Sequence, residues 1–389
     1  MGFGDVVGPM VSLAKQTFTL SNFMAELLPF SGFILFGLLS VPLGILQARV
    51  GKKRILLSGL LIALGGLLIP ILAGMYGARL TISSGEAMKF YVLLLSILLL
   101  GAGATALQVV GNPIMRDVSP AGTYSQNLSL AQAVKAIGSS LGFLLPPIAM
   151  AAFGFDWPIL FPVYAAIVAL TLLLSFSLQA PAAQETQNAA PNLRSCLSLF
   201  LDNSLVFKMT LGIFVYVGAE VCLSSGVPLL LKSKFGIMGF TLWTSWALFF
   251  LPILIGRFAG AAILRKIKPR KFLILTTALS ILGILCTFGK SEIQIFTGIV
   301  LTSLGFANIF PLIFSITIDA HPQQSDEISG LMVTAIVGGA IIPPLMGLVA
   351  DATHSIQTGF VVPLVAIVYI AWVAVSHLKT ALPIEITAA

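Results

Sequence analysis

The sequence predicts an all-α integral membrane protein, and three observations lead to this class. Hydrophobic residues make up 58% of the 389 residues and charged residues only 9%, whereas a soluble domain carries about 25% charged residues. The apolar residues form runs long enough for membrane helices, which need roughly 20 residues each. These runs are continuous rather than alternating, which argues against a membrane β-barrel.

Eleven apolar runs predict membrane-spanning helices along the chain. They lie at about 22–48, 55–77, 88–112, 124–152, 158–178, 208–231, 240–264, 272–288, 291–317, 327–350 and 357–378. Before them, the stretch from Gly2 to Lys15 has the composition of the second half of another span. We therefore expect twelve helices with a first helix that is truncated at its N-terminus.

The only long polar connection predicts a division into two halves. It begins at Gln179, and its Ala, Pro, Gln and Asn residues suit a linker at the membrane surface. The expected boundaries are an N-terminal half at 1–178, a cytoplasmic linker at 179–206 and a C-terminal half at 207–389. Each half would contain six helices when the first segment is counted.

Short echoes between the halves indicate an internal duplication. With the Gly2–Lys15 segment counted as the first span, the second span ends in ARVGKKR and the eighth in RKIKPRK. These are the two densest basic clusters of the chain. The fifth span contains AIGSSLGFLLPP and the eleventh AIVGGAIIPP, each a stretch of small residues before two prolines. Two six-helix halves related by pseudo-symmetry are the expected architecture.

The charge pattern concerns topology and excludes several classes of function. The formal net charge of +7 does not indicate nucleic-acid binding, because the basic residues gather at the ends of apolar runs. Most loop lysines and arginines fall on one side when both termini are cytoplasmic, so a multi-pass protein of the inner membrane is expected. The three cysteines and three histidines lack metal-ligand spacing, and the sequence contains no ATP-binding motif and no nucleophile–base arrangement. We expect no metal, no cofactor and no enzyme activity.

Polar residues inside the apolar runs mark the candidate site, because such residues usually face a cavity or a partner. Gln108 and Asn112 lie four residues apart on one helical face, and their amides suit either a polyhydroxyl ligand or a neighbouring helix. Asp5 lies in the first segment, where a low-dielectric cavity would favour proton uptake; a frayed, exposed terminus is the alternative.

Lys135 and Glu220 lie at similar expected depths in the two halves. Lys135 shares a helical face with Gln132 and lies too deep to reach the membrane surface easily. Its side chain would form a structural ion pair or contact the substrate. A bridge between Lys135 and Glu220 across the halves is one hypothesis, and a Glu220 carboxylate bonded within its own half is the other.

Several stretches in order resemble the major facilitator superfamily, and within it the fucose:proton symporter family that also holds the glucose/galactose transporters. They include GDVVGP, VPLGILQARVGKKR, LQVVGNP, NLSLAQAVKAIGS, YVGAEV, IGRFAGAAIL, FPLIFS and IVGGAIIPPLMGLVAD. The resemblance covers nearly the whole chain. It implies a monomeric secondary transporter that moves a sugar-like solute with a coupling ion, proton or sodium, by alternating access.

The resemblance also implies roles for individual residues. Asp5 matches a first-span carboxylate implicated in proton coupling, and Gln108, Gln132 and Phe310 match cavity positions. Lys135 stands where the fucose permease has Asn, and this difference favours a substrate with a carboxylate or neutralises Glu220. The candidate ion-coupling residues are Asp5 and Glu220; the candidate substrate-binding residues are Gln108, Asn112, Gln132, Lys135 and Phe310.

Two other functions stay open at this level. An exporter of small amphipathic compounds shares the basic loop after the second span, although the deep amides disfavour it. A membrane sensor on the same scaffold would bind a solute without transporting it.

Overall fold

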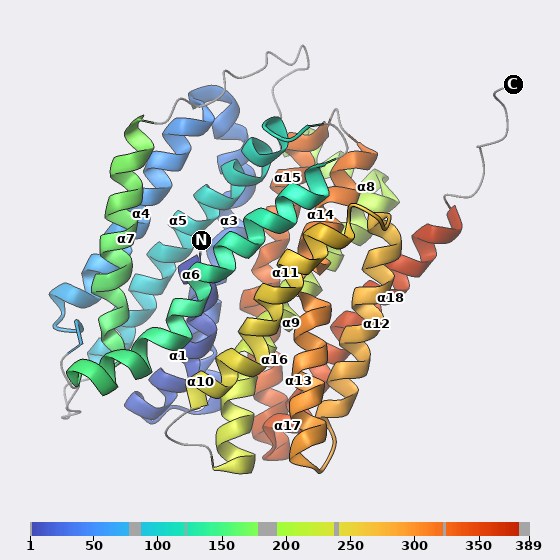
Figure 1. Cartoon of the computed structure of the whole chain (residues 1–389). Helices are drawn as coiled ribbons and strands as arrows, with labels where there is room; N and C mark the ends of the chain where they lie inside the picture. The colour runs from blue at the N-terminus through green and yellow to red at the C-terminus, as the bar shows by residue number, and fades with distance from the viewer. Residues whose placement is uncertain are drawn as a thin grey trace, which may run out of the picture.

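Long helices cross the molecule side by side in the computed structural model (Figure 1). The structure describes residues 2–77, 87–120, 123–177, 193–236, 241–321 and 324–380. Among these residues, eleven helices are long and apolar enough to span a membrane. The predicted fold class is confirmed, and the described residues form no strand.

The first half contains α1 (Gly2–Phe18), α3 (Leu27–Val50), α4 (Lys52–Leu72), α5 (Ala87–Asp117), α6 (Tyr124–Phe153) and α7 (Leu160–Ser177). The short helix α2 (Asn22–Ala25) precedes α3, and the turn η1 (Trp157–Ile159) precedes α7. Within this half α4 packs against α5 and α7, and α3 packs against α5. These helices gather mainly on the left of Figure 1.

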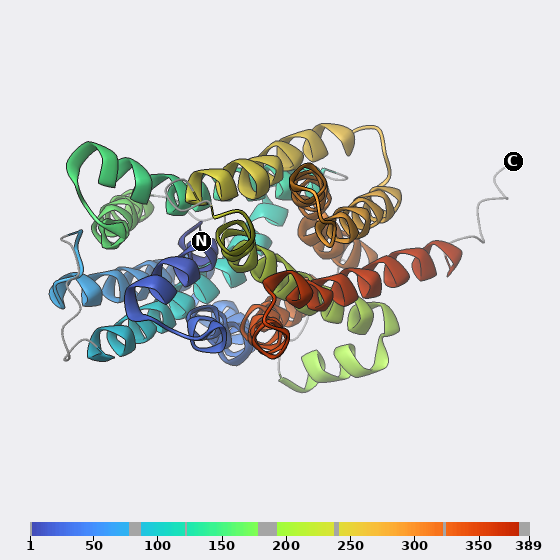
Figure 2. The same cartoon turned by 90° about the horizontal axis from the view of Figure 1, so that it is seen from below.

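The second half is built on α9 (Ser204–Phe235), α12 (Pro269–Thr287) and α18 (Val361–Thr380), together with three helical segments that are interrupted. The interrupted segments are α10 (Thr241–Ser245) with the π-helical turn η2 (Trp246–Phe250) and α11 (Leu251–Ile263), then α13 (Glu292–Phe306) with α14 (Ile309–Ala320), then α15 (Ser325–Thr334) with η4 (Ala335–Val337) and α16 (Gly338–Thr353). The short α17 (Ile356–Gly359) leads into α18. Figure 2 shows this half beside the first when the molecule is viewed from below.

The connection between the halves is partly helical. Residues 178–192 lie outside the described residues, and they include half of the predicted linker at 179–206. Its later part forms α8 (Leu193–Asp202), and the Asn203 side chain then caps α9 by accepting from the backbone N–H groups of Leu205 and Val206.

Local sequence explains several turns and close helix contacts. Gly51 has a φ of 89° between α3 and α4, a conformation that side chains with a Cβ rarely adopt. Gly101 on α5 lies against α3 so closely that an added Cβ would fall 2.2 Å from the Gly32 carbonyl oxygen. Small residues allow this close packing in membranes, where helices gain little from the hydrophobic effect.

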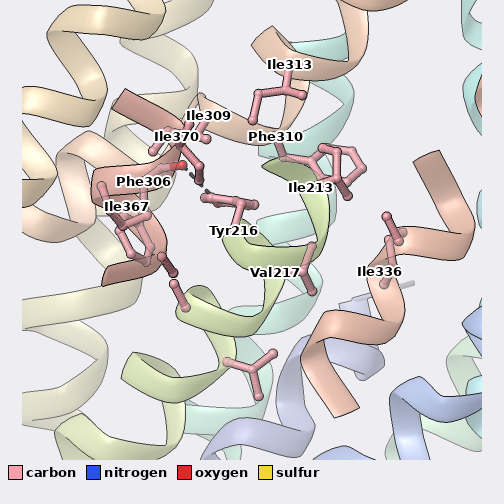
Figure 3. Packing of buried hydrophobic residues seen from close by; sticks show 14 of the residues in the cluster. Ile213, Tyr216, Val217, Phe306, Ile309, Phe310, Ile313, Ile336, Ile367 and Ile370 are labelled. Carbon is pink, nitrogen blue, oxygen red and sulfur yellow. Dashed lines mark hydrogen bonds between the residues drawn. The ribbon is translucent and has the colours of Figure 1, made fainter. Parts of the chain in front are cut away.

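The core of the second half surrounds Tyr216 on α9. This side chain is fully buried, and its hydroxyl donates a 2.9 Å hydrogen bond to the Phe306 carbonyl oxygen at the end of α13 (Figure 3). The buried tyrosine thereby satisfies its polar atom while its ring packs against Phe306. Figure 3 also shows Val217, Phe310 and Ile336 at the edge of this cluster, where the wall of a central cavity begins.

Candidate functional site

A central cavity lies between the halves, and both halves contribute to its wall. Its volume is about 60 Å³, enough for several water molecules. The first half contributes Gly8, Phe33, Phe36, Ala104, Gln108, Gln132 and Lys135; the second contributes Val217, Glu220, Val221, Ser224, Phe250, Arg257, Phe310 and Ile336. Aromatic and aliphatic side chains with a few polar groups are the usual lining of a small-molecule site.

Five of the predicted site residues meet on this wall. They are Gln108, Gln132, Lys135, Glu220 and Phe310. Gln108 on α5 and Gln132 on α6 are each 5% exposed, so their amides are held inside the protein where a ligand can use both donors and acceptors. Phe310 is the second residue of α14 and stacks on Phe314 with ring centroids 5.6 Å apart, which gives the wall an aromatic face.

Two other predicted site residues are not among the described residues of this wall. The Asp5 side chain lies outside the described residues, although Gly8 on the same helix lines the cavity. Asn112 is 4% exposed, and the described residues that line the cavity do not include it. Its amide nitrogen has no hydrogen-bond partner among the described residues, so a buried donor remains one turn beyond Gln108.

Arg257 is the site residue that the sequence analysis missed. It is 3% exposed, and its Nη2 lies 3.3 Å from the Oε1 of Glu220 on α9. Its Nη1 donates across the interface to the carbonyl oxygen of Gln132 at 3.0 Å. The signal was present, because Arg257 is a charged residue inside the apolar run 240–264, and such residues usually face a cavity or a partner.

The break between α13 and α14 helps to hold Arg257. The chain leaves the helical pattern at Ala307 and Asn308, so the Ala307 carbonyl oxygen is free to accept from the Arg257 Nε at 3.3 Å. The Asn308 amide donates to the Gly256 carbonyl oxygen at 2.7 Å, which ties the break to the residue before the arginine. Irregular backbone at membrane depth is tolerated where it is buried in protein in this way.

Both members of this ion pair therefore lie in the same half of the protein. Glu220 and Arg257 both belong to the second half, as the alternative to the interhalf bridge supposed. Lys135 lines the same cavity from the first half. Direct pairing of Lys135 with Glu220 stays a hypothesis.

A second, wider hollow opens at one end of the bundle. We call the end that carries the junctions Ala48–Arg54 and Arg265–Lys271 the basic end, and the other end the distal end. The distal hollow has a volume of about 860 Å³ and is lined from both halves, with Lys15 and Asn22 on one side and Lys232 and Asp351 on the other. We call it the distal vestibule.

The halves contact each other toward both ends of the central cavity. Toward the basic end, a Cβ on Gly44 of α3 would lie 4.0 Å from the Gly330 backbone of α15. At the distal end, the Asn22 amide donates to the Asp351 carboxylate, and the Phe23 N–H donates to its second oxygen at 3.2 Å. A cavity with a few buried polar groups between two helical halves is the arrangement in which membrane transporters hold their solute.

Comparison with known proteins identifies the group. The family model described as Major Facilitator Superfamily matches residues 1–335 and 209–383. The chain belongs to the major facilitator superfamily. This result confirms the predicted family and fold.

Individual relatives refine the comparison. The chain is 28% identical to a glucose/galactose transporter of Brucella abortus over 370 residues, which covers 92% of this chain and 86% of the relative. It is 25% identical to the L-fucose-proton symporter of Escherichia coli, covering 90% and 84%. The crystal structure of the superfamily transporter FucP in its outward conformation superposes with a TM-score of 0.73 at 22% identity, covering 96% of both chains.

Proposed function

We propose that this protein imports a sugar or sugar-like solute together with a proton, by alternating access of its two halves. The observation that carries the proposal is the wall of the central cavity, where the buried amides of Gln108 and Gln132 face charged groups between the halves. Amides pair well with sugar hydroxyls because each offers donors and an acceptor. The names of the relatives, a glucose/galactose transporter and an L-fucose-proton symporter, support the same substrate class and the proton.

Within this proposal, the polar residues have distinct roles. Gln108, Gln132 and Lys135 bind the polar edge of the solute, and Phe310 packs against its ring. Glu220 and Asp5 take part in ion coupling, with Arg257 holding the Glu220 carboxylate in place. Asn112 lies off the described wall, one turn beyond Gln108, and is given no contact with the solute.

The orientation proposed for the chain follows from its charges. Both basic junctions lie at one end, so we place this end in the cytoplasm of a bacterial inner membrane. The distal vestibule then faces the outside. The half boundaries remain 1–178 and 207–389, and the monomer is the proposed functional unit.

Uptake into proteoliposomes tests the proposal. The purified protein is reconstituted, a proton or a sodium gradient is imposed, and accumulation of labelled hexoses, deoxyhexoses and sugar acids is measured. We expect accumulation of at least one of these sugars under the proton gradient, and loss of accumulation after a protonophore. Absence of accumulation under both gradients, in vesicles shown to be sealed, would refute sugar symport; efflux-only transport would indicate an exporter.

A further inference from the structure

Glu26 is a buried carboxyl group that the proposed mechanism has not used. It lies between α2 and α3, at the residue before the span Leu27–Gln47, and it is 1% exposed. Two of its neighbours belong to the opposite half. The Ser225 hydroxyl of α9 faces it while donating to the Cys222 carbonyl oxygen at 3.3 Å, and a Cβ on Gly347 of α16 would lie 3.5 Å from its Cγ.

This position separates the two hollows of the molecule. On α9, Ser225 lies one helical turn inside Leu229, which lines the distal vestibule, and next to Ser224, which lines the central cavity. Glu26 itself lies one turn inside Asn22, another vestibule residue. The carboxyl group thus fills the distal contact between the halves, in the layer between vestibule and cavity.

The surroundings favour the neutral acid. The Oε2 atom has no hydrogen-bond partner among the described residues, and burying an ionised oxygen without a partner is costly. Burial raises the pKa of the Glu26 carboxyl to about 8, against the smaller lowering effects of Ser225 and Lys15. A carboxyl group exposed to water has a pKa of about 4.3.

The charged and titratable groups that face Glu26 come from three helices. Lys15 faces it from α1, and its ammonium donates a hydrogen bond to Asn22. Cys222 faces it from α9, and Asp351 lies one turn beyond Gly347 on α16, held by Asn22. The ammonium of Lys15 is therefore directed to the polar contact at the vestibule floor rather than to the carboxyl group below it.

We infer that Glu26 is a proton-binding residue of the transport cycle, which takes up a proton from the distal vestibule when the halves close there and releases it when they part. In the open state its carboxylate would be hydrated, and in the closed state it is a neutral acid against Ser225 and Gly347. The inference rests on the alternating access of the proposed function but not on the identity of the solute.

The sign of the pH dependence follows from linkage. The closed state binds one more proton than the open state. The equilibrium constant for closing the distal side therefore rises by up to about tenfold for each unit by which the pH falls between about pH 8 and pH 4.3. Above about pH 8, Glu26 is ionised in both states and the dependence ends. Raising the pH therefore opens the distal side.

Thiol labelling measures this opening without any substrate. Ala104 lines the central cavity from α5, so an Ala104→Cys reporter reacts with a membrane-impermeant maleimide added from the distal side only when that side is open. The reporter is placed in a chain whose native cysteines, Cys196, Cys222 and Cys286, are replaced. Labelling rates are measured between pH 5 and pH 9. Each rate is divided by the rate of a free thiol at the same pH, which corrects for the pH dependence of the maleimide reaction itself.

We expect the corrected labelling rate to rise at least about tenfold from pH 5 to pH 8. The neutral Glu26→Gln variant should label slowly with a flat profile. Glu292→Gln removes an exposed acid at the distal start of α13 and serves as the matched control with the profile of the parent. A parent without pH dependence, or a Glu26→Gln variant that keeps the parent profile, would overturn the inference.

A second variant reports on the same carboxyl group without removing it. Ser225→Ala removes the hydroxyl that lowers the pKa of the Glu26 carboxyl, so the upper midpoint of the labelling profile should move to higher pH. An unmoved or lowered midpoint also overturns the inference. These outcomes are read without uptake, so a failure of sugar transport in the vesicle assay is distinguishable from a failure of the Glu26 inference.

Discussion

The Nη2 atom of Arg257 lies 3.3 Å from the Oε1 atom of Glu220 and holds that carboxylate at the wall of the central cavity. The same guanidinium donates to the Gln132 carbonyl oxygen in the other half. One side chain thus links the ion pair of the second half to the first half, at the place where alternating access requires the halves to separate. In the proposed alternating access, opening the cavity between α6 and α11 would break this contact.

Arg257→Gln should reduce the initial uptake rate by at least about tenfold. Without the guanidinium, the Glu220 carboxylate loses the charged partner that holds it at the cavity wall; its side chain is 23% exposed, so water replaces only part of that interaction. Uptake is compared at equal amounts of folded protein, with the exposed loop variant Arg265→Gln as control.

A double-mutant cycle separates the pair from other contacts of Arg257. If the ion pair matters, Arg257→Gln combined with Glu220→Gln should be less harmful than the product of the two single effects. Purely multiplicative effects on uptake would mean that the arginine acts through the carbonyl oxygens alone.

Lys135→Asn tests the charge of the substrate. If the ammonium contacts a substrate carboxylate, the variant should lose competition by sugar acids while competition by neutral sugars is kept or strengthened. Lys135→Arg retains the charge and is the matched control. Selectivity identical to that of the parent in both variants would exclude a role of this charge in substrate choice.

Gln108→Ala should raise the half-saturation concentration for uptake by about tenfold, since a lost hydrogen bond to substrate is worth about 1–1.5 kcal/mol. Asn112→Ala is the informative comparison, because Asn112 lies on the same helix but off the described wall. We expect its half-saturation concentration to change by less than about twofold. An equal effect of both variants would show that Asn112 also contacts the solute.

Gly101→Ala should destabilise the first half. The added methyl group would fall 2.2 Å from the Gly32 carbonyl oxygen, so α5 and α3 would have to separate; such overpacking costs about 1–3 kcal/mol. A lower unfolding temperature of the purified protein in detergent checks this. Gly65→Ala on α4 meets no atom within 4 Å and should leave the temperature nearly unchanged.

The membrane class and most helices follow from the sequence because they depend on local composition. Each of the eleven expected runs corresponds to an observed candidate span, although the ends differ. The run 208–231 became the longer helix Ser204–Phe235, and the run 291–317 became two helices broken at Ala307 and Asn308. Hydropathy measures the length of an apolar run, but tertiary contacts decide where its backbone is interrupted.

Hydropathy also predicted which polar residues lie at depth, and five of them line the central cavity. It did not determine their partners. Depth along a helix predicts height in the membrane, whereas the direction of a side chain around the helix axis depends on which distant helix packs there. Packing between distant helices therefore sets the pairing of Arg257 with Glu220, the position of Asn112 off the wall and the burial of Glu26 between the halves.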